Sequence, residues 1–268
     1  VLDPSQAGAD LPLLTGIPRP VPIVASVAEG MVYGPQVAVV GLAPSGGQLQ
    51  KELRRSVAEA LQAGLSVASG LHTKLATDPE FAALLQPGQW IWDLRVEPAQ
   101  LQVAAARAAA LPCRRVLFLG TDMSVGKMST ALELTAAALS QGLDARFVGT
   151  GQAGILISGA GVALDAVRID YAAGAVEFAL LQTAAGAGPA AIVFVEGQGS
   201  FCHPGSSASL PLLRGSQPTD LVMVHRAGQG AIRGLPEVPL PPLCELIKSC
   251  ETLGSFAIPN GNVAPEVR

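Results

Sequence analysis

The stretch VLFLGTDMSVGK, residues 116–127, consists of an apolar run followed by a loop that two glycines bracket. The apolar run predicts a strand that is covered on both faces, and residues 127–141 predict a helix. Gly120 and Gly126 permit tight backbone angles, so successive N–H groups of the loop can point inward toward an anion. A strand, such a loop and a helix N-terminus in this order are typical of a phosphate-binding site.

Lys127 adds a positive charge to the loop in a chain that has four lysines against thirteen arginines. Two features depart from the usual phosphate loop. Five residues rather than four separate the glycines, and Met128 stands where a Ser or Thr hydroxyl normally ligates Mg²⁺. Ser129 or Thr130 can supply a hydroxyl, although neither is at the usual place. The loop therefore supports phosphate binding better than Mg-ATP hydrolysis. The residues expected to bind the ligand are Gly120, Thr121, Asp122, Ser124, Val125, Gly126, Lys127, Met128 and Ser129.

The second half of the chain alternates strands with helices, which predicts an α/β domain of the P-loop NTPase type with a doubly wound parallel sheet. Strands are expected at 116–119, 145–149, 191–195 and 221–225, and helices at 127–141 and 172–185. Because the carboxyl ends of parallel strands meet at one edge of the sheet, Gly120, Thr150, Glu196 and His225 are expected to lie along that edge.

The first half predicts a Rossmann-like domain. Residues 37–42 form an apolar run, 43–47 a turn, 49–61 an amphipathic helix and 65–69 a second strand, which together make a β-α-β unit. Before it lies an irregular, proline-rich segment, residues 1–22, and after it come the aromatic stretch 90–92 and an alanine-rich helix at 99–110. Pro112 and the following basic pair mark the expected boundary between domains 1–112 and 113–268.

Acids and histidines at the carboxyl edge are the candidate catalytic residues. Glu196 can hold a metal or orient a nucleophile there, or it can cap a helix or loop. Asp170 can be a second acid that faces Glu196, or the N-cap of the helix near Ala172. His203 and His225 fall at the same edge, and the unperturbed proton affinity of histidine suits acid–base work near neutrality.

Polar residues near this edge are candidates for substrate binding. Thr150 and Gln152 follow a strand in the segment GTGQAG and can hydrogen-bond a carboxylate or an amide, unless the segment is a plain glycine turn. Gln198, close to Glu196, is expected to join them. No metal site is expected, because the four cysteines lack metal-ligand spacing, and no Gly-x-Ser-x-Gly nucleophile elbow occurs.

Composition narrows the class of protein. Of the 268 residues 14% are charged, against about 25% in an average soluble domain, and 49% are hydrophobic, so a disordered chain is excluded. The net charge of −4 argues against a nucleic-acid partner. No stretch reaches the ~18 apolar residues of a membrane span, and no secretory leader is visible. The four cysteines show no C-x-x-C pairing, which indicates reduced thiols, and a cytoplasmic protein is therefore expected. No interaction with membranes is expected.

Several segments beyond the phosphate loop resemble one family, the P-loop proteins catalogued as domain of unknown function 1611. They lie in the family's order between about residues 37 and 226: GLAPSGG (41–47), SGLH (69–72), WDLR (92–95), GTDMSVGKM (120–128), GTGQAG (149–154), DAVRID (165–170) and EGQGS (196–200) with His203-Pro204. The resemblance implies a Rossmann-like domain joined to a domain similar to dethiobiotin synthetase, with Met after the loop lysine as a family trait. It also implies that this chain lacks the first β-α unit and the final strand segment.

Three functions follow as hypotheses. Because members of the family are assigned as D-glutamate N-acetyltransferases, the resemblance favours transfer of an acetyl group from acetyl-CoA to the amine of a D-amino acid. An ATP- and Mg-dependent ligase or kinase similar to dethiobiotin synthetase is the alternative, with Glu196 and Asp170 holding the metal. A nucleotide-binding protein without turnover is the third. Each takes a small-molecule ligand, and a homodimer is the expected assembly.

Overall fold

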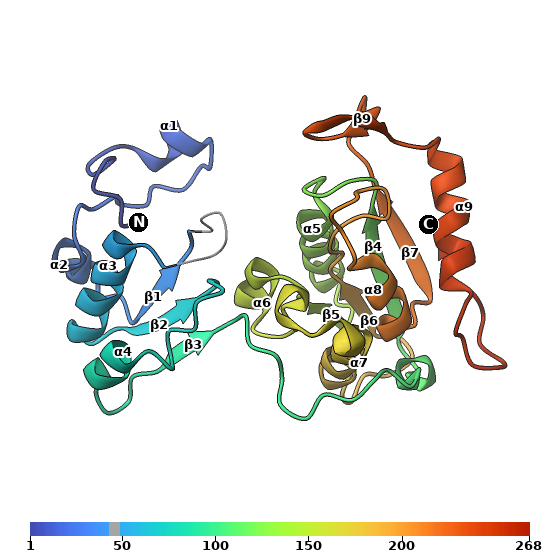
Figure 1. Ribbon diagram of the computed structural model, residues 1–268, viewed down its shortest axis with the longest axis horizontal. Coiled ribbons are helices and arrows are strands. Elements are labelled where there is room, and N and C mark those ends of the chain that lie inside the picture. Colours follow the sequence, from blue (N-terminus) through green and yellow to red (C-terminus); the bar gives the residue numbers. More distant parts are fainter. Residues whose placement is uncertain (43–48) are drawn as a thin grey trace. The chain divides into compact units, whose positions relative to one another are not determined.

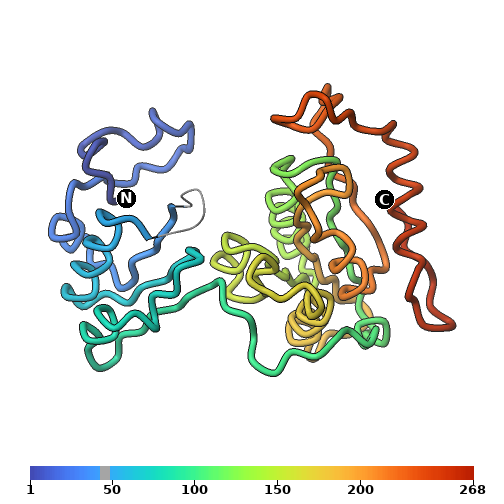
Figure 2. The backbone as a smooth tube through the Cα atoms, viewed as in Figure 1, coloured from blue at the N-terminus to red at the C-terminus, as the bar shows by residue number. Residues whose placement is uncertain are grey.

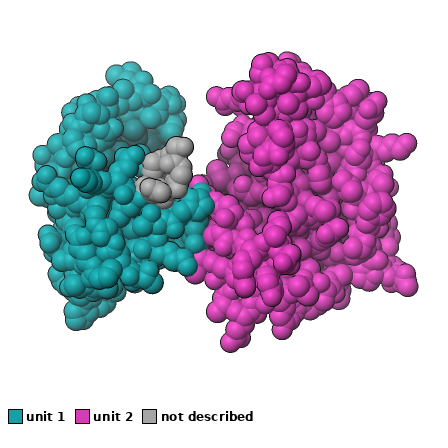
Figure 3. Space-filling view, in the orientation of Figure 1, with its two compact units in different colours: residues 1–95 teal, residues 96–268 magenta. Residues whose placement is uncertain are grey.

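The computed structural model describes residues 1–42 and 49–268, so the predicted turn at 43–47 lies outside the described residues. The chain divides into two compact units, Val1–Arg95 and Val96–Arg268 (Figure 3). This division comes earlier in the chain than the expected boundary at Pro112, because the segment between the two points belongs to the second unit. Within the described residues, no helix is both long and apolar enough to cross a membrane.

The second unit is built on a five-stranded sheet in the order β10-β7-β4-β6-β5, and every pair in it is parallel (Figure 1). Its strands are β4 (Arg114–Gly120), β5 (Ala145–Val148), β6 (Ile192–Val195), β7 (Asp220–Val224) and β10 (Glu266–Val267). Its α-helices are α5 (Lys127–Ser140), α6 (Gln152–Ser158), α7 (Ala172–Thr183), α8 (Ser209–Ser216) and α9 (Leu243–Gly254). Short 3-10 helices lie at η3 (Arg107–Ala110), η4 (Leu164–Ala166) and η5 (Ile169–Tyr171), and a small hairpin joins β8 (Ala231–Ile232) to β9 (Leu235–Pro239).

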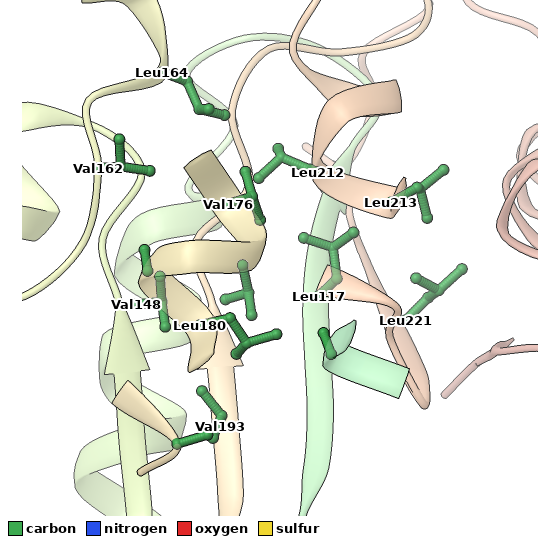
Figure 4. Packing of buried hydrophobic residues seen from close by; sticks show 14 of the residues in the cluster. Leu117, Val148, Val162, Leu164, Val176, Leu180, Val193, Leu212, Leu213 and Leu221 are labelled. Atoms are coloured by element: carbon green, nitrogen blue, oxygen red, sulfur yellow. The ribbon is translucent and has the colours of Figure 1, made fainter. Parts of the chain in front are cut away.

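Helices cover both faces of this sheet, as a doubly wound fold requires. Leu117 and Leu119 of β4 point into a core with α7, α8 and α9, part of which Figure 4 shows. Val116 and Phe118 alternate with them and pack on the other face against α5. The predicted α/β fold with a parallel sheet is therefore confirmed for this unit.

The alanine-rich stretch 99–110 was expected to be a helix, and that expectation is wrong. Only Arg107–Ala110 form a short 3-10 helix, and Ala106 before it has a left-handed φ of 55°. The cause is Glu177 of α7, which is fully buried and accepts hydrogen bonds from the N–H groups of Ala105 (3.2 Å) and Arg107 (2.6 Å). The free-energy cost of burying a carboxylate without hydrogen-bond donors exceeds the gain that the helix propensity of alanine would give.

The first unit carries a parallel three-stranded sheet in the order β1-β2-β3, made of Val37–Val40, Ser66–Ser69 and Ile91–Asp93. Helix α3 (Lys51–Gln62) connects β1 to β2 and packs on one face of the sheet with α4 (Pro79–Leu84). The predicted β-α-β unit is thus confirmed. Residues 1–22 follow an irregular path with one short helix, α1 (Leu11–Thr15), before α2 (Val27–Gly30) and the 3-10 helix η1 (Met31–Tyr33), as Figure 2 shows.

Glu177 generates a prediction about stability. Glu177→Ala leaves the Ala105 and Arg107 N–H groups without their acceptor and breaks the 2.7 Å ion pair with Arg107. The free energy of unfolding should fall by about 1.5–3 kcal/mol, the range for hydrogen bonds to a charged group. Urea unfolding measures it, with exposed Glu133→Ala on α5 as the matched control, which should stay within about 0.5 kcal/mol of wild type. An equal, small effect of both changes would contradict the anchoring role.

Candidate functional site

The phosphate loop lies between β4 and α5, where the sequence predicts it. Ser124 and Gly126 adopt left-handed φ values of 56° and 106°, and Gly126 is the N-cap of α5. A Cβ at Gly120 would lie 2.9 Å from side-chain atoms of Val125 and Lys127, so a larger residue here would displace the loop lysine. The first N–H groups of α5 have no partner within the helix, so they are available to an anion held in the loop.

Lys127 is folded back over the loop and is only 5% exposed. Its Nζ donates a hydrogen bond to the backbone oxygen of Asp122 at 2.8 Å. Its aliphatic chain lies against the backbone of Gly197, where a Cβ would be 2.9 Å from the Lys127 Cδ. Burial lowers the pKa of Lys127 to about 8, although the carboxylates of Asp122 and Glu196 favour its charged form.

Asp122 joins the loop to the β8–β9 hairpin. Its Oδ1 accepts from the N–H of Met123 at 2.6 Å, and its Oδ2 accepts from the Gln229 side chain at 2.6 Å and the Arg233 N–H at 2.7 Å. Burial opposes the charge of this carboxylate, but the N–H groups of Arg233 and Met123 and the Gln229 amide hold its pKa below the usual range. Asp122 is therefore an ionised anchor between two segments that are distant in the sequence.

Glu196 follows β6 and is buried against the loop after β5. Its Oε2 accepts hydrogen bonds from the N–H groups of Thr150 (2.7 Å) and Gly151 (3.1 Å), just before α6. Its Oε1 accepts from the Gln198 side chain at 3.3 Å. Burial raises the pKa of Glu196, although these N–H groups and the Lys127 charge favour ionisation. Both carboxylate oxygens are thus engaged in the capping arrangement that the sequence left open, and a catalytic role for Glu196 stays a prediction.

The candidate substrate-binding residues gather around Glu196. Thr150 is buried, and its hydroxyl donates to the backbone oxygen of Glu196 at 2.9 Å, so this hydroxyl serves the fold. Gln152 is the first residue of α6 and Gln198 lies two residues after Glu196, and both side chains are half-buried. The structure therefore leaves the two glutamines, rather than Thr150, able to reach a ligand.

The two candidate histidines lie beside the phosphate loop. His225, directly after β7, is exposed, and its Nδ1 is 3.1 Å from the hydroxyl oxygen of Thr121. His203 is half-buried, its Nδ1 accepts from the Gly205 N–H at 3.0 Å, and its charge favours ionisation of Asp122. Burial raises the pKa of the neighbouring Cys202 thiol, which makes it a poor nucleophile. The carboxyl edge therefore assembles groups that follow three strands: the loop after β4, Glu196 and His203 after β6, and His225 after β7.

Asp170 comes from another segment of the second unit, just before α7. It lies in η5 and is exposed, and Tyr171 rather than Asp170 is the N-cap residue of α7. Across the part of the chain that the structure describes, no hydrogen bond joins Asp170 to Glu196. A role for Asp170 as a second acid that faces Glu196 stays a prediction.

The two hydroxyl residues that follow Lys127, Ser129 and Thr130, differ in exposure and in hydrogen bonding. Thr130 donates its hydroxyl to the backbone oxygen of Gly126 at 3.0 Å, whereas Ser129 is exposed and Met128 half-buried. Of the two residues that can replace the usual Mg²⁺ ligand, Ser129 is the one whose hydroxyl faces solvent.

The segment after His225 was missed by sequence reasoning. Gln229 and Arg233 bind Asp122, and the Arg226 guanidinium donates to the Ser124 backbone oxygen at 3.1 Å. A usable signal was present, because two arginines flank the turn AGQG directly after a strand that ends at the predicted edge.

Family models match most of the chain. Residues 102–264 match the P-loop domain described as domain of unknown function DUF1611_C, and residues 4–97 match the Rossmann-like domain DUF1611_N. A crystal structure of a DUF1611 family protein from Anabaena variabilis has a TM-score of 0.91 and 52% identity, and the match covers 100% of this chain and 76% of that one.

Two curated relatives carry the name D-glutamate N-acetyltransferase. That of Tritonibacter scottomollicae is 36% identical over 82% of this chain, and that of a Pseudoalteromonas species is 38% identical over 81%. This chain spans 65% and 64% of their respective lengths.

The buried position of Lys127 predicts a pH dependence of stability. Its folded-state pKa of about 8 lies below the ordinary 10.5, so between these values the unfolded chain binds more protons than the folded one. The free energy of unfolding should therefore rise with pH across this window, by at most about 3 kcal/mol from this group. Urea unfolding at pH 7.5, 8.5 and 9.5 measures the slope. Lys127→Met should remove this contribution, whereas Lys248→Met, at an exposed position of α9, should leave the wild-type slope. Identical slopes in all three proteins would contradict the assignment.

Proposed function

We propose that this chain, which belongs to the DUF1611 family, transfers the acetyl group of acetyl-CoA to the amino group of a D-amino acid such as D-glutamate. The observation that carries the proposal is the match of over four-fifths of the chain to two relatives named for this reaction. The phosphate loop adds chemical support, because CoA carries the phosphate groups that such a loop binds.

The loop residues fit a phosphate-bearing ligand. The N-terminus of α5 offers unpartnered N–H groups, and the glycines at 120 and 126 let the backbone approach closely. Lys127 provides a positive charge at the same place, and burial lowers its pKa to about 8. A bound phosphate would favour the charged form of Lys127, so ligand binding and protonation should support each other.

Acetyl transfer requires a neutral amine. The amino acid enters mainly as an ammonium ion, so a base has to remove one proton before nitrogen attacks the thioester carbonyl. A C–N bond then forms, the C–S bond breaks, and CoA leaves as a thiolate that takes up a proton. His225 is the proposed base, because it is exposed beside the loop and the Thr121 hydroxyl fixes one ring nitrogen at 3.1 Å.

Gln152 and Gln198 are proposed to bind the acceptor. Both lie next to the Glu196 carboxylate, and their amides can donate hydrogen bonds to a carboxylate of the amino acid. Glu196 acts here as a positioning residue that holds the start of α6 through Thr150 and Gly151. His203 is a second candidate for proton transfer, although its Nδ1 is engaged by Gly205.

The experiment is an assay of the purified chain with acetyl-CoA and D-glutamate. Free CoA should appear in equal amount with N-acetylglutamate, and the rate should survive EDTA because the thioester supplies the driving force without ATP. Lys127→Ala should abolish both products, and Lys248→Ala should leave them unchanged. If instead ADP forms from ATP only with substrate present and chelation stops it, a ligase or kinase that uses the exposed Ser129 hydroxyl replaces this proposal.

His225→Asn tests the proposed base. The turnover rate should fall about 10²-fold or more, the usual contribution of a general base, while the dissociation constant for CoA stays within a few-fold. Raising the pH should partly restore the rate, because more of the amine is then neutral without help. Isothermal titration and initial rates from pH 6 to 9 measure both quantities. A variant with an unchanged rate and pH profile would remove His225 from the mechanism.

A further inference from the structure

The walls of the phosphate loop hold little net positive charge. Lys127 is the cation of the loop itself, and the carboxylates of Asp122 and Glu196 both act on it. Asp122 is kept ionised by its hydrogen bonds. A ligand such as CoA carries a pyrophosphate and a separate 3′-phosphate, so one buried lysine between two acids is a poor electrostatic match for it.

A second segment brings further cations to the same loop. Asp122 accepts hydrogen bonds from the Gln229 side chain and the Arg233 N–H, which fixes the segment after β7 against the loop. The Arg226 guanidinium lies there as well, 3.1 Å from the Ser124 backbone oxygen. Arg226 is therefore held beside the phosphate loop through its guanidinium and Arg233 through its backbone N–H, and neither contact neutralises the charge of the side chain.

Neither arginine has its charge neutralised by the protein. Both residues are exposed, and within residues 1–42 and 49–268 neither guanidinium forms an ion pair with a carboxylate. Other arginines of this unit do form such pairs, among them Arg107, Arg114, Arg146 and Arg168. Guanidinium groups bind phosphate oxygens with paired hydrogen bonds, which makes arginine well suited to phosphates.

We propose that Arg226 and Arg233 bind a phosphate group of the ligand beyond the one seated in the loop, and so select a multiply phosphorylated cofactor such as CoA. The proposal rests on the proposed function, because it takes the loop as the phosphate site. Asp122 is the positioning residue, since its carboxylate holds the arginine-bearing segment in place. The phosphate concerned is either the pyrophosphate or the 3′-phosphate of CoA.

Binding of three probes to the whole chain tests the proposal: CoA, 3′-dephospho-CoA and inorganic pyrophosphate, each by isothermal titration. Arg226→Gln and Arg233→Gln should each weaken CoA binding about tenfold, as expected for loss of a charged hydrogen bond. Arg214→Gln, an exposed arginine on α8, is the matched control and should bind CoA like the wild type. If the arginines bind the 3′-phosphate, the variants should bind dephospho-CoA like the wild type; if they bind the pyrophosphate, all three probes should weaken.

Two results overturn the proposal, and they can be told apart. If Lys127→Ala loses CoA binding while both arginine variants bind CoA within twofold of wild type, the loop is the phosphate site and the arginines have no part in it. If the wild-type chain binds none of the three probes, the proposed function fails and this inference falls with it.

Discussion

The hydrogen bonds from the N–H groups of Thr150 and Gly151 to the buried carboxylate of Glu196 hold together the loops at the carboxyl edge of the sheet in the second unit. A parallel sheet delivers every strand end to one edge, where the loops leave N–H groups that need acceptors. Glu196 meets this need between β5 and β6, and Asp122 meets it between the phosphate loop and the β8–β9 hairpin. Glu196 and Asp122 thereby connect the loops that follow the four neighbouring strands β7, β4, β6 and β5.

These acids also set the electrostatics of the site. Lys127 lies close enough to both for their charges to favour its protonated form, yet burial still lowers its pKa to about 8. The Lys127 Nζ is held by the Asp122 backbone oxygen at 2.8 Å. Under the proposed function, a phosphate in the loop would favour the charged form of Lys127 and so offset the cost of burying this lysine.

Structure that depends on residues adjacent in the sequence could be predicted, whereas contacts between residues far apart in the sequence could not. Strand β4, the phosphate loop and α5 follow from one short stretch, and the parallel sheet follows from strand–helix alternation. The helix expected at 99–110 fails because Glu177, some seventy residues away, captures its N–H groups. The role of Glu196 was open between catalysis and capping because that choice depends on Thr150 and Gly151. The contacts of Arg226 and Arg233 with the loop span over a hundred residues, so the arginines around the turn AGQG mark the segment in the sequence but do not identify its partner.

The most direct test of this account is a crystal structure of the chain with bound CoA. We expect phosphate density within hydrogen-bond distance of the Lys127 Nζ and the first N–H groups of α5, with Glu196 still hydrogen-bonded to Thr150 and Gly151. The Lys127 Nζ should then have turned from the Asp122 backbone oxygen toward the phosphate. Density for the CoA phosphates at any other place, with the loop empty, would contradict the central claim.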